Sequence, residues 1–123
     1  MASIGKILIV DDNADMRGIM ICMLGSSGFH VIAAEDGLIG LRIAEAERPD
    51  LIITDICMPR MDGIQMILRL RAQFEFSEVP ILVITAYGSG TTEEALKAGA
   101  NHAMHKPVDF NSFIGCINEL LQA

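Results

Sequence analysis

Lys6-Ile-Leu-Ile-Val-Asp-Asp12 decides the fold, because it joins a run of apolar residues to a pair of carboxylates. Three more segments have the same form: Leu51-Ile-Ile-Thr-Asp55, Pro80-Ile-Leu-Val-Ile-Thr85 and Asn101-His-Ala-Met-His-Lys106. Short apolar runs of this kind are typical of strands buried in a parallel sheet. The carboxyl ends of parallel strands share one edge, where open α/β sheets bind ligands. We therefore expect carboxylates, a hydroxyl and an ammonium to converge at that edge.

Stretches with helical periodicity separate these segments. Together with a further strand at residues 29–33, the alternation predicts an α/β protein of (βα)5 type, with a doubly wound parallel sheet and helices on both faces. Asp36, Asp62 and Asp109 are expected as helix N-caps. We expect three apolar stripes at helical spacing to face the core: Met16, Ile19, Met20, Met23 and Leu24; Ile64, Ile67 and Leu68; and Phe110, Phe113, Ile114 and Ile117.

The bulk composition limits the class of protein. With 123 residues, 51% of them hydrophobic, the chain is expected to form a single domain over residues 1–123, with its core at 6–121. No apolar stretch approaches the roughly 18 residues of a membrane span, and no signal-peptide core follows Met1. The net charge of −7 argues against direct nucleic-acid binding. Cys22, Cys57 and Cys116 lack metal or redox spacing and fit free thiols in a reducing cytoplasm.

The acidic residues at strand ends suit a metal-assisted phosphoryl acceptor. Asp11 and Asp12 are adjacent, and a hard cation such as Mg2+ would relieve their repulsion. The alternative for this pair is a plain N-cap of the helix that begins near Asn13. Asp55 follows an apolar strand, where a carboxylate is poorly solvated unless it has a purpose or a partner. It fits a nucleophile that becomes an aspartyl phosphate, and the alternative is a cap for the following loop.

Two residues at other strand ends complete this chemistry. Thr85 could donate a hydrogen bond to a phosphoryl oxygen, and Lys106 could neutralise phosphoryl charge. Each also has an ordinary interpretation, because threonine is common in strands and lysine is common on surfaces. Pro107 follows Lys106, and a cis bond between them would turn the chain and hold the ammonium over the site.

Several short motifs, taken in order, resemble the receiver (phosphoacceptor) domain of bacterial two-component response regulators. They are Ile9-Val-Asp-Asp-Asn13, Asp55-Ile-Cys-Met-Pro-Arg-Met-Asp-Gly63, Ile84-Thr-Ala86, Ala98-Gly-Ala100 and Lys106-Pro107. The resemblance spans residues 6–121, and its most diagnostic part is the motif at 55–63. It implies a flavodoxin-like fold with strand order 2-1-3-4-5. It also implies a phosphorelay signalling domain rather than an enzyme, limited to self-phosphorylation from small donors and self-dephosphorylation.

The resemblance assigns each site residue a role in phosphotransfer. Asp55 is the phosphoacceptor, Thr85 and Lys106 contact the phosphoryl group, and the Lys106–Pro107 bond is cis. The donor is a sensor histidine kinase or a histidine phosphotransfer protein. The other implied partners are a downstream output protein or domain and a homodimer that forms on phosphorylation, with neither nucleic acid nor membrane bound directly.

The resemblance also implies a metal site. Asp12 and Asp55 bind Mg2+ directly, the backbone carbonyl of Cys57 completes the protein ligands, and Asp11 acts through water. Mn2+ is expected as a substitute ion, and the location is expected to be cytoplasmic.

The chain departs from the family at Ala103. Three residues before the active-site lysine, receivers usually have an aromatic residue or a histidine that turns inward when the threonine moves. Alanine has no rotamer to switch, so we expect the response to depend more on residues 86–89, with Tyr87 as the moving aromatic. The alternative is that Tyr87 is only an exposed loop residue.

Three other classes of protein share parts of this pattern. A phosphohydrolase of the haloacid-dehalogenase type also uses Asp, Mg2+ and Lys, but this chain lacks a DxD pattern after its first strand. A flavodoxin-like cofactor binder should have a phosphate loop rich in Ser, Thr and Gly, whereas acidic residues follow Val10. A receiver-like scaffold that is never phosphorylated is the third of these classes. A free-standing receiver and a fragment of a longer regulator or hybrid kinase both fit the sequence.

Overall fold

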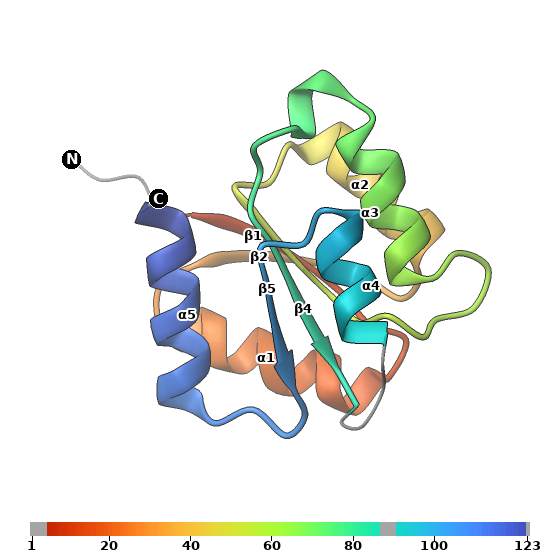
Figure 1. Cartoon of the computed structure of the whole chain (residues 1–123). Coiled ribbons are helices and arrows are strands. Elements are labelled where there is room, and N and C mark those ends of the chain that lie inside the picture. The colour runs from red at the N-terminus through yellow and green to blue at the C-terminus, as the bar shows by residue number, and fades with distance from the viewer. Residues whose placement is uncertain (1–4, 87–90, 123) are drawn as a thin grey trace.

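A computed structural model describes residues 5–86 and 91–122, built around a central β-sheet (Figure 1). The sheet has five strands in the order β2-β1-β3-β4-β5. They are β1 (Lys6–Val10), β2 (His30–Ala34), β3 (Leu51–Thr54), β4 (Ile81–Thr85) and β5 (His102–His105). All neighbouring strands are parallel, so their carboxyl ends share one edge. The expected strand order is confirmed.

The register brings the acidic strand ends together. Val10 of β1 lies opposite Thr54 of β3. The residues that follow them, Asp11 and Asp55, therefore leave neighbouring strands at the same level. The apolar side chains of β1, β3 and β4 are almost fully buried, which is why these three runs occupy the centre of the sheet.

Helices alternate with the strands along the chain. They are α1 (Ala14–Ser26), α2 (Gly37–Glu47), α3 (Gly63–Arg71), α4 (Thr91–Ala98) and α5 (Phe110–Gln122), with a 3-10 turn η1 (Phe74–Phe76). The expected caps are confirmed by hydrogen bonds from backbone amides: Ile39 to Asp36 (2.9 Å), Gln65 to Asp62 (2.8 Å) and Ser112 to Asp109 (3.0 Å). Within the described ranges, no helix has the length and apolarity needed to span a bilayer.

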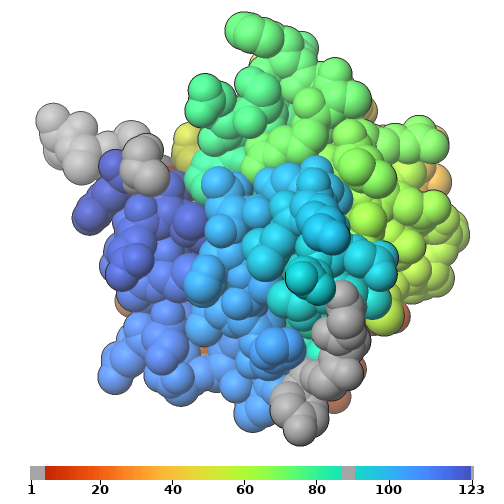
Figure 2. All heavy atoms as spheres, in the orientation of Figure 1, coloured from red at the N-terminus to blue at the C-terminus, as the bar shows by residue number. Residues whose placement is uncertain are grey.

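The helices form two layers, one on each face of the sheet (Figure 1). Leu8 and Val10 of β1 pack with residues of α2, α3 and α4. Ile7 and Ile9 of the same strand pack with residues of α1 and α5 on the other face. This alternation confirms a doubly wound fold with helices on both faces. The edge strand β5 reaches the surface between α4 and α5 (Figure 2).

Each predicted apolar stripe includes one residue that the core does not cover. Ile19 is 49% exposed, Leu68 is 53% exposed and Phe110 is 44% exposed. The prediction that these three residues face the core is wrong. A helix packed on a sheet buries only the narrow face directed at the strands, and these side chains lie on the flank of that face.

Candidate active site

The two adjacent carboxylates after β1 have different environments. Asp11 is fully buried, whereas Asp12 is exposed. Oδ1 of Asp11 accepts a hydrogen bond from the Asn13 amide at 2.9 Å. The N-cap of α1 is Asn13, whose side chain accepts from the Met16 amide. The Asp pair therefore does not serve as the plain cap of this helix.

Asp55 lies at the end of β3 and is 8% exposed. Its Oδ1 accepts a hydrogen bond from the Ile56 amide at 2.6 Å, which fixes the carboxylate plane. The start of α3 packs directly against this residue. A Cβ atom at Gly63 would lie 2.1 Å from the Asp55 carbonyl oxygen, so only glycine allows this approach. Close packing therefore explains why the 55–63 motif ends in a glycine.

Lys106 follows β5 and bridges the two buried carboxylates. Its Nζ lies 2.8 Å from Oδ2 of Asp55 and 3.0 Å from Oδ2 of Asp11. The Lys106–Pro107 bond is cis, and the Lys106 amide donates to the Thr85 carbonyl at 2.9 Å. Partial burial lowers the pKa of Lys106, but the carboxylates of Asp55 and Asp11 outweigh it and raise that pKa above its usual value. The ammonium is therefore kept charged between the two acids.

Asp11, Asp12 and Asp55 form an acidic cluster. Each offers a carboxylate oxygen, and these atoms lie within 4.8 Å of one another; no other such group of metal-ligating side chains occurs in the described part of the chain. Oδ2 of Asp11 is buried and has no hydrogen-bond donor beyond its ion pair with Lys106. Carboxylate oxygens are the ligands that Mg2+ prefers. The residues present therefore fit a hard divalent cation.

The structure places the remaining predicted residues around this cluster. Thr85 is buried at the end of β4, beside the strand that carries Lys106. Cys57 is an exposed free thiol just beyond the Asp55 segment. Ala103 is half-buried and packs against the core layer of α2, α3 and α4. Tyr87 lies outside the described residues.

Two arginines near the site have no predicted role. Nη1 of Arg17 donates to the Asp11 carbonyl at 2.7 Å and so holds the start of the acidic segment. Arg60 forms an ion pair with the buried Asp36. Sequence spacing gave no signal for either contact, because a backbone carbonyl has no residue-type signature and Asp36 is far from Arg60 in the chain.

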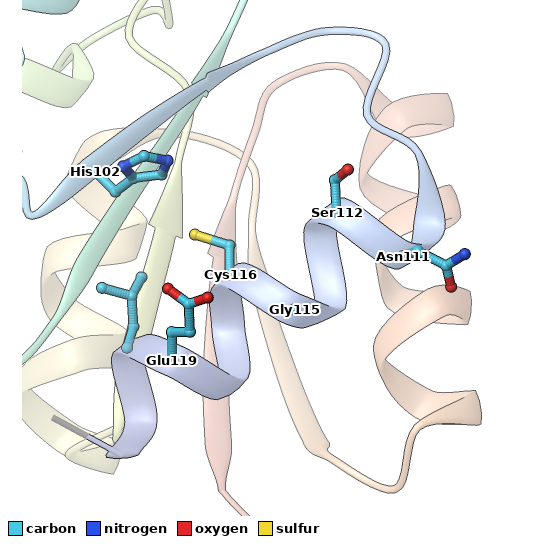
Figure 3. Close-up of a pocket in the computed structure, with 7 residues that line it drawn as sticks. His102, Asn111, Ser112, Gly115, Cys116 and Glu119 are labelled. Carbon is cyan, nitrogen blue, oxygen red and sulfur yellow. The ribbon is translucent and has the colours of Figure 1, made fainter.

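A separate hollow lies between β5 and α5 (Figure 3). Its volume is about 400 Å3. The side chains of His102, Cys116 and Glu119 contribute to its lining, which includes no member of the acidic cluster. Burial, together with the Glu119 carboxylate, raises the pKa of the Cys116 thiol. A thiol with a raised pKa is a weaker nucleophile at neutral pH.

Comparison with known proteins agrees with the geometry. The family described as "Response regulator receiver domain" matches residues 7–118. This chain belongs to that family. It is 33% identical to protein PilH of Pseudomonas aeruginosa over 117 residues, which cover 94% of this chain and 97% of PilH. It is 36% identical to the transcriptional regulatory protein PrrA of Mycobacterium tuberculosis, covering 95% of this chain and 50% of PrrA.

A solved structure provides a further comparison. The receiver domain of a sensor histidine kinase from Pseudomonas aeruginosa, which has a magnesium ion coordinated in its active-site cleft, superposes with a TM-score of 0.92. Its sequence is 31% identical, and the match covers 98% of this chain and 100% of that domain. Receiver domains are signalling modules of phosphorelays rather than classical enzymes, and they typically bind Mg2+ at an acidic site. Neither a haloacid-dehalogenase-type hydrolase nor an unphosphorylated scaffold is supported.

Proposed function

We propose that residues 1–123 act as one receiver domain, in which Asp55 accepts a phosphoryl group from a sensor histidine kinase or a histidine phosphotransfer protein. The observation that carries this proposal is the position of Lys106. Its ammonium lies against Asp55 (2.8 Å) and Asp11 (3.0 Å), beside an acidic cluster at the carboxyl edge of the sheet. A fixed cation at this place can neutralise the charge that a phosphoryl group brings.

The transfer itself needs a carboxylate nucleophile. An oxygen of Asp55 attacks the phosphorus of the donor's phosphohistidine, the P–N bond breaks, and its electron pair returns to the imidazole. The Ile56 amide orients this carboxylate through Oδ1. Oδ2 faces Lys106. Lys106 then pairs with the transferred phosphoryl oxygens, and the Thr85 hydroxyl donates a hydrogen bond to another of them.

Mg2+ is the cofactor that these residues suit, with Mn2+ as a substitute. Asp12 is exposed and Asp55 faces the same cluster, so we assign them as direct ligands together with the Cys57 backbone carbonyl. Asp11 already uses Oδ1 for an amide and Oδ2 for Lys106, which suits a role through water. When bound, the ion would cancel repulsion between the carboxylates and the phosphoryl oxygens.

Phosphorylation would be read out by a change at the end of β4. Thr85 moves toward the phosphoryl group, and Ala103 has no rotamer with which to follow it. We assign the larger change to residues 86–89, which include Tyr87. The result would alter contacts with an output protein or domain, or with a second copy of the chain, in the cytoplasm. Beyond phosphotransfer, the activity would be limited to self-phosphorylation from small donors and self-dephosphorylation.

The decisive experiment is incubation with acetyl phosphate and Mg2+, followed by intact-mass measurement. The wild-type chain should gain one phosphoryl group, and chelation of the metal should prevent the gain. Asp55→Asn keeps the shape but removes the nucleophile, so this variant should gain nothing. Modification of Asp55→Asn at the wild-type rate would place the acceptor elsewhere, and an unmodified wild-type chain would overturn the proposal.

A further inference from the structure

An ion pair joins the segment after β3 to the start of α2. Nε of Arg60 donates to Oδ2 of Asp36 at 2.8 Å, and Nη2 of the same guanidinium pairs with the same oxygen. Asp36 is 1% exposed and caps α2 by accepting from the Ile39 amide. The Ile39 amide, together with the Arg60 guanidinium, holds the pKa of Asp36 below its usual value despite burial. The carboxylate is therefore charged at neutral pH and available as a fixed anchor.

A backbone contact lies directly beside this ion pair. The Gly37 amide donates to the Met61 carbonyl at 3.1 Å. A Cβ atom at Gly37 would lie 2.2 Å from that carbonyl oxygen, so the two segments are in tight contact. Residues 60 and 61 are thus tied to residues 36 and 37 in succession.

Arg60 also adopts a backbone conformation that its side chain does not favour. Its φ is 66°, in the left-handed region that is unfavourable for a residue with a Cβ. Glycine would be the default residue at this position. The ion pair with Asp36 needs a guanidinium, which glycine would not supply, so the arginine has a physical reason to be there.

The segment between Ile56 and Met61 carries a proposed metal ligand. One of its ends is held at the site, where the Ile56 amide donates to Asp55 and the Gly63 amide donates to the Ile56 carbonyl at 2.8 Å. The other end is held by the contacts of Arg60 and Met61 with α2. Cys57 lies between these anchors and is exposed, so its backbone depends on them for its position.

We propose that Arg60 is a positioning residue for the metal site: its ion pair with Asp36 holds the segment after β3 so that the Cys57 carbonyl is aimed at the ion. This inference rests on the proposed function, because it needs Cys57 to be a ligand. Groups that orient metal ligands typically change metal affinity when they are removed. Loss of the Arg60 side chain should therefore weaken Mg2+ binding, although it also removes a positive charge that would repel the ion.

Arg60→Gly is the test, and Arg48→Gly is its matched control. Arg48 also has a positive φ, of 50°, and also forms an ion pair, with Glu75 at 3.9 Å, but it lies at the other end of α2. Glycine relieves the backbone in both variants and removes one guanidinium from each. We expect the Kd for Mg2+, measured by NMR titration, to rise on the order of tenfold in Arg60→Gly. The Kd of Arg48→Gly should stay at the wild-type value.

Two further measurements separate positioning from general destabilisation. In metal-free protein, hydrogen exchange at the Gly37 amide should accelerate in Arg60→Gly and remain unchanged in Arg48→Gly. Asn at position 36 still caps a helix, so Asp36→Asn keeps the cap but removes the charge and one of the two acceptor oxygens. In that background, Arg60→Gly should have little additional effect on the Kd.

The failures of the two proposals are distinguishable. If the wild-type chain binds no Mg2+, the proposed function is overturned and the positioning role falls with it. If the wild type binds Mg2+ and takes up one phosphoryl group, but Arg60→Gly has the same Kd and the same Gly37 exchange, only the positioning role is wrong. Additive effects of Arg60→Gly and Asp36→Asn on the Kd would also overturn it.

Discussion

Two half-buried cations lie at opposite edges of the sheet and have different partners. Lys106, at the carboxyl edge, contacts the carboxylates of Asp11 and Asp55. Arg71, at the amino edge, contacts neutral oxygens of the residues around the starts of β4 and β5. Its guanidinium donates to the carbonyls of Phe76 (2.6 Å), Val79 (2.7 Å) and Gly99 (2.8 and 3.1 Å) and to Oδ1 of Asn101 (2.9 Å).

The nature of the acceptors decides what each cation can do. Burial lowers the pKa of both groups, but only Lys106 has two adjacent carboxylates that reverse the shift. The planar fork of Arg71 satisfies several carbonyls at once, and a Cβ at Gly99 would lie 2.7 Å from its Cγ. Arg71 is therefore locked in place. Lys106 is a point charge that contacts two carboxylates. An incoming cation can replace its ammonium beside a carboxylate, and a phosphoryl group can replace a carboxylate beside its ammonium.

Arg71→Ala should have the largest effect on folding. It leaves several carbonyls without a donor, so the free energy of unfolding should fall by about 2–4 kcal/mol. Urea unfolding followed by circular dichroism measures this. Arg69→Ala is the matched control, since Arg69 is exposed on the same last turn of α3 and its removal should change the free energy by less than about 0.5 kcal/mol.

Arg71→Ala also tests whether the cation at the amino edge affects phosphorylation at the carboxyl edge. Folded Arg71→Ala should still gain one phosphoryl group from acetyl phosphate at a rate close to the wild type. A stable but unreactive Arg71→Ala would show that the two edges are coupled. An unfolding free energy equal to that of Arg69→Ala would show that the guanidinium is not a structural tie.

The strands and the position of the site could be predicted from the sequence, because residue type and periodicity reveal both. The apolar runs predict all the strands to within one residue; the run at 80–84, for example, becomes β4 at Ile81–Thr85. Parallel pairing then brings Asp11, Asp55 and Lys106 to one edge. The prediction for Ile19 is wrong because periodicity shows which side of a helix faces the sheet but not how wide a part of that side the sheet covers.

The contacts of Arg17, Arg60 and Arg71 could not be predicted. Two of these arginines donate to backbone carbonyls, which any residue supplies, and the third reaches a carboxylate 24 residues away in the chain. Only the three-dimensional arrangement identifies such acceptors. The roles of the individual site residues in metal binding and phosphotransfer stay predictions, which the proposed experiments test.

The two carboxylates after β1 should differ in their effect on Mg2+ binding. Asp12 is exposed and proposed as a direct ligand, so Asp12→Asn should raise the Kd for Mg2+ about tenfold or more. Asp11 is engaged with Asn13 and Lys106, so Asp11→Asn should raise the Kd for Mg2+ by less than Asp12→Asn does. Metal titrations followed by NMR provide the values, and the chain has no tryptophan for a fluorescence assay. Equal affinities in the two variants would contradict the difference between direct and water-mediated ligands.

Lys106→Ala should have the smallest effect on the Kd for Mg2+ and should clearly weaken the structural response to phosphorylation. The ammonium pairs with Oδ2 of Asp55, which we propose as a metal ligand, so its removal should leave Mg2+ binding intact and tighten it by no more than about fivefold, the equivalent of an accessible ion pair. The carboxylates raise the pKa of Lys106 above 10.5, so its contribution to folding is present at neutral pH and is lost only as the pH rises through that raised value. Titrations at neutral pH therefore compare a charged side chain with none. With no cation to engage the phosphoryl oxygens, the amide spectra of the phosphorylated and unphosphorylated variant should differ less than those of the wild type. An equally large difference in the variant would mean that the cation at this edge is as purely structural as Arg71.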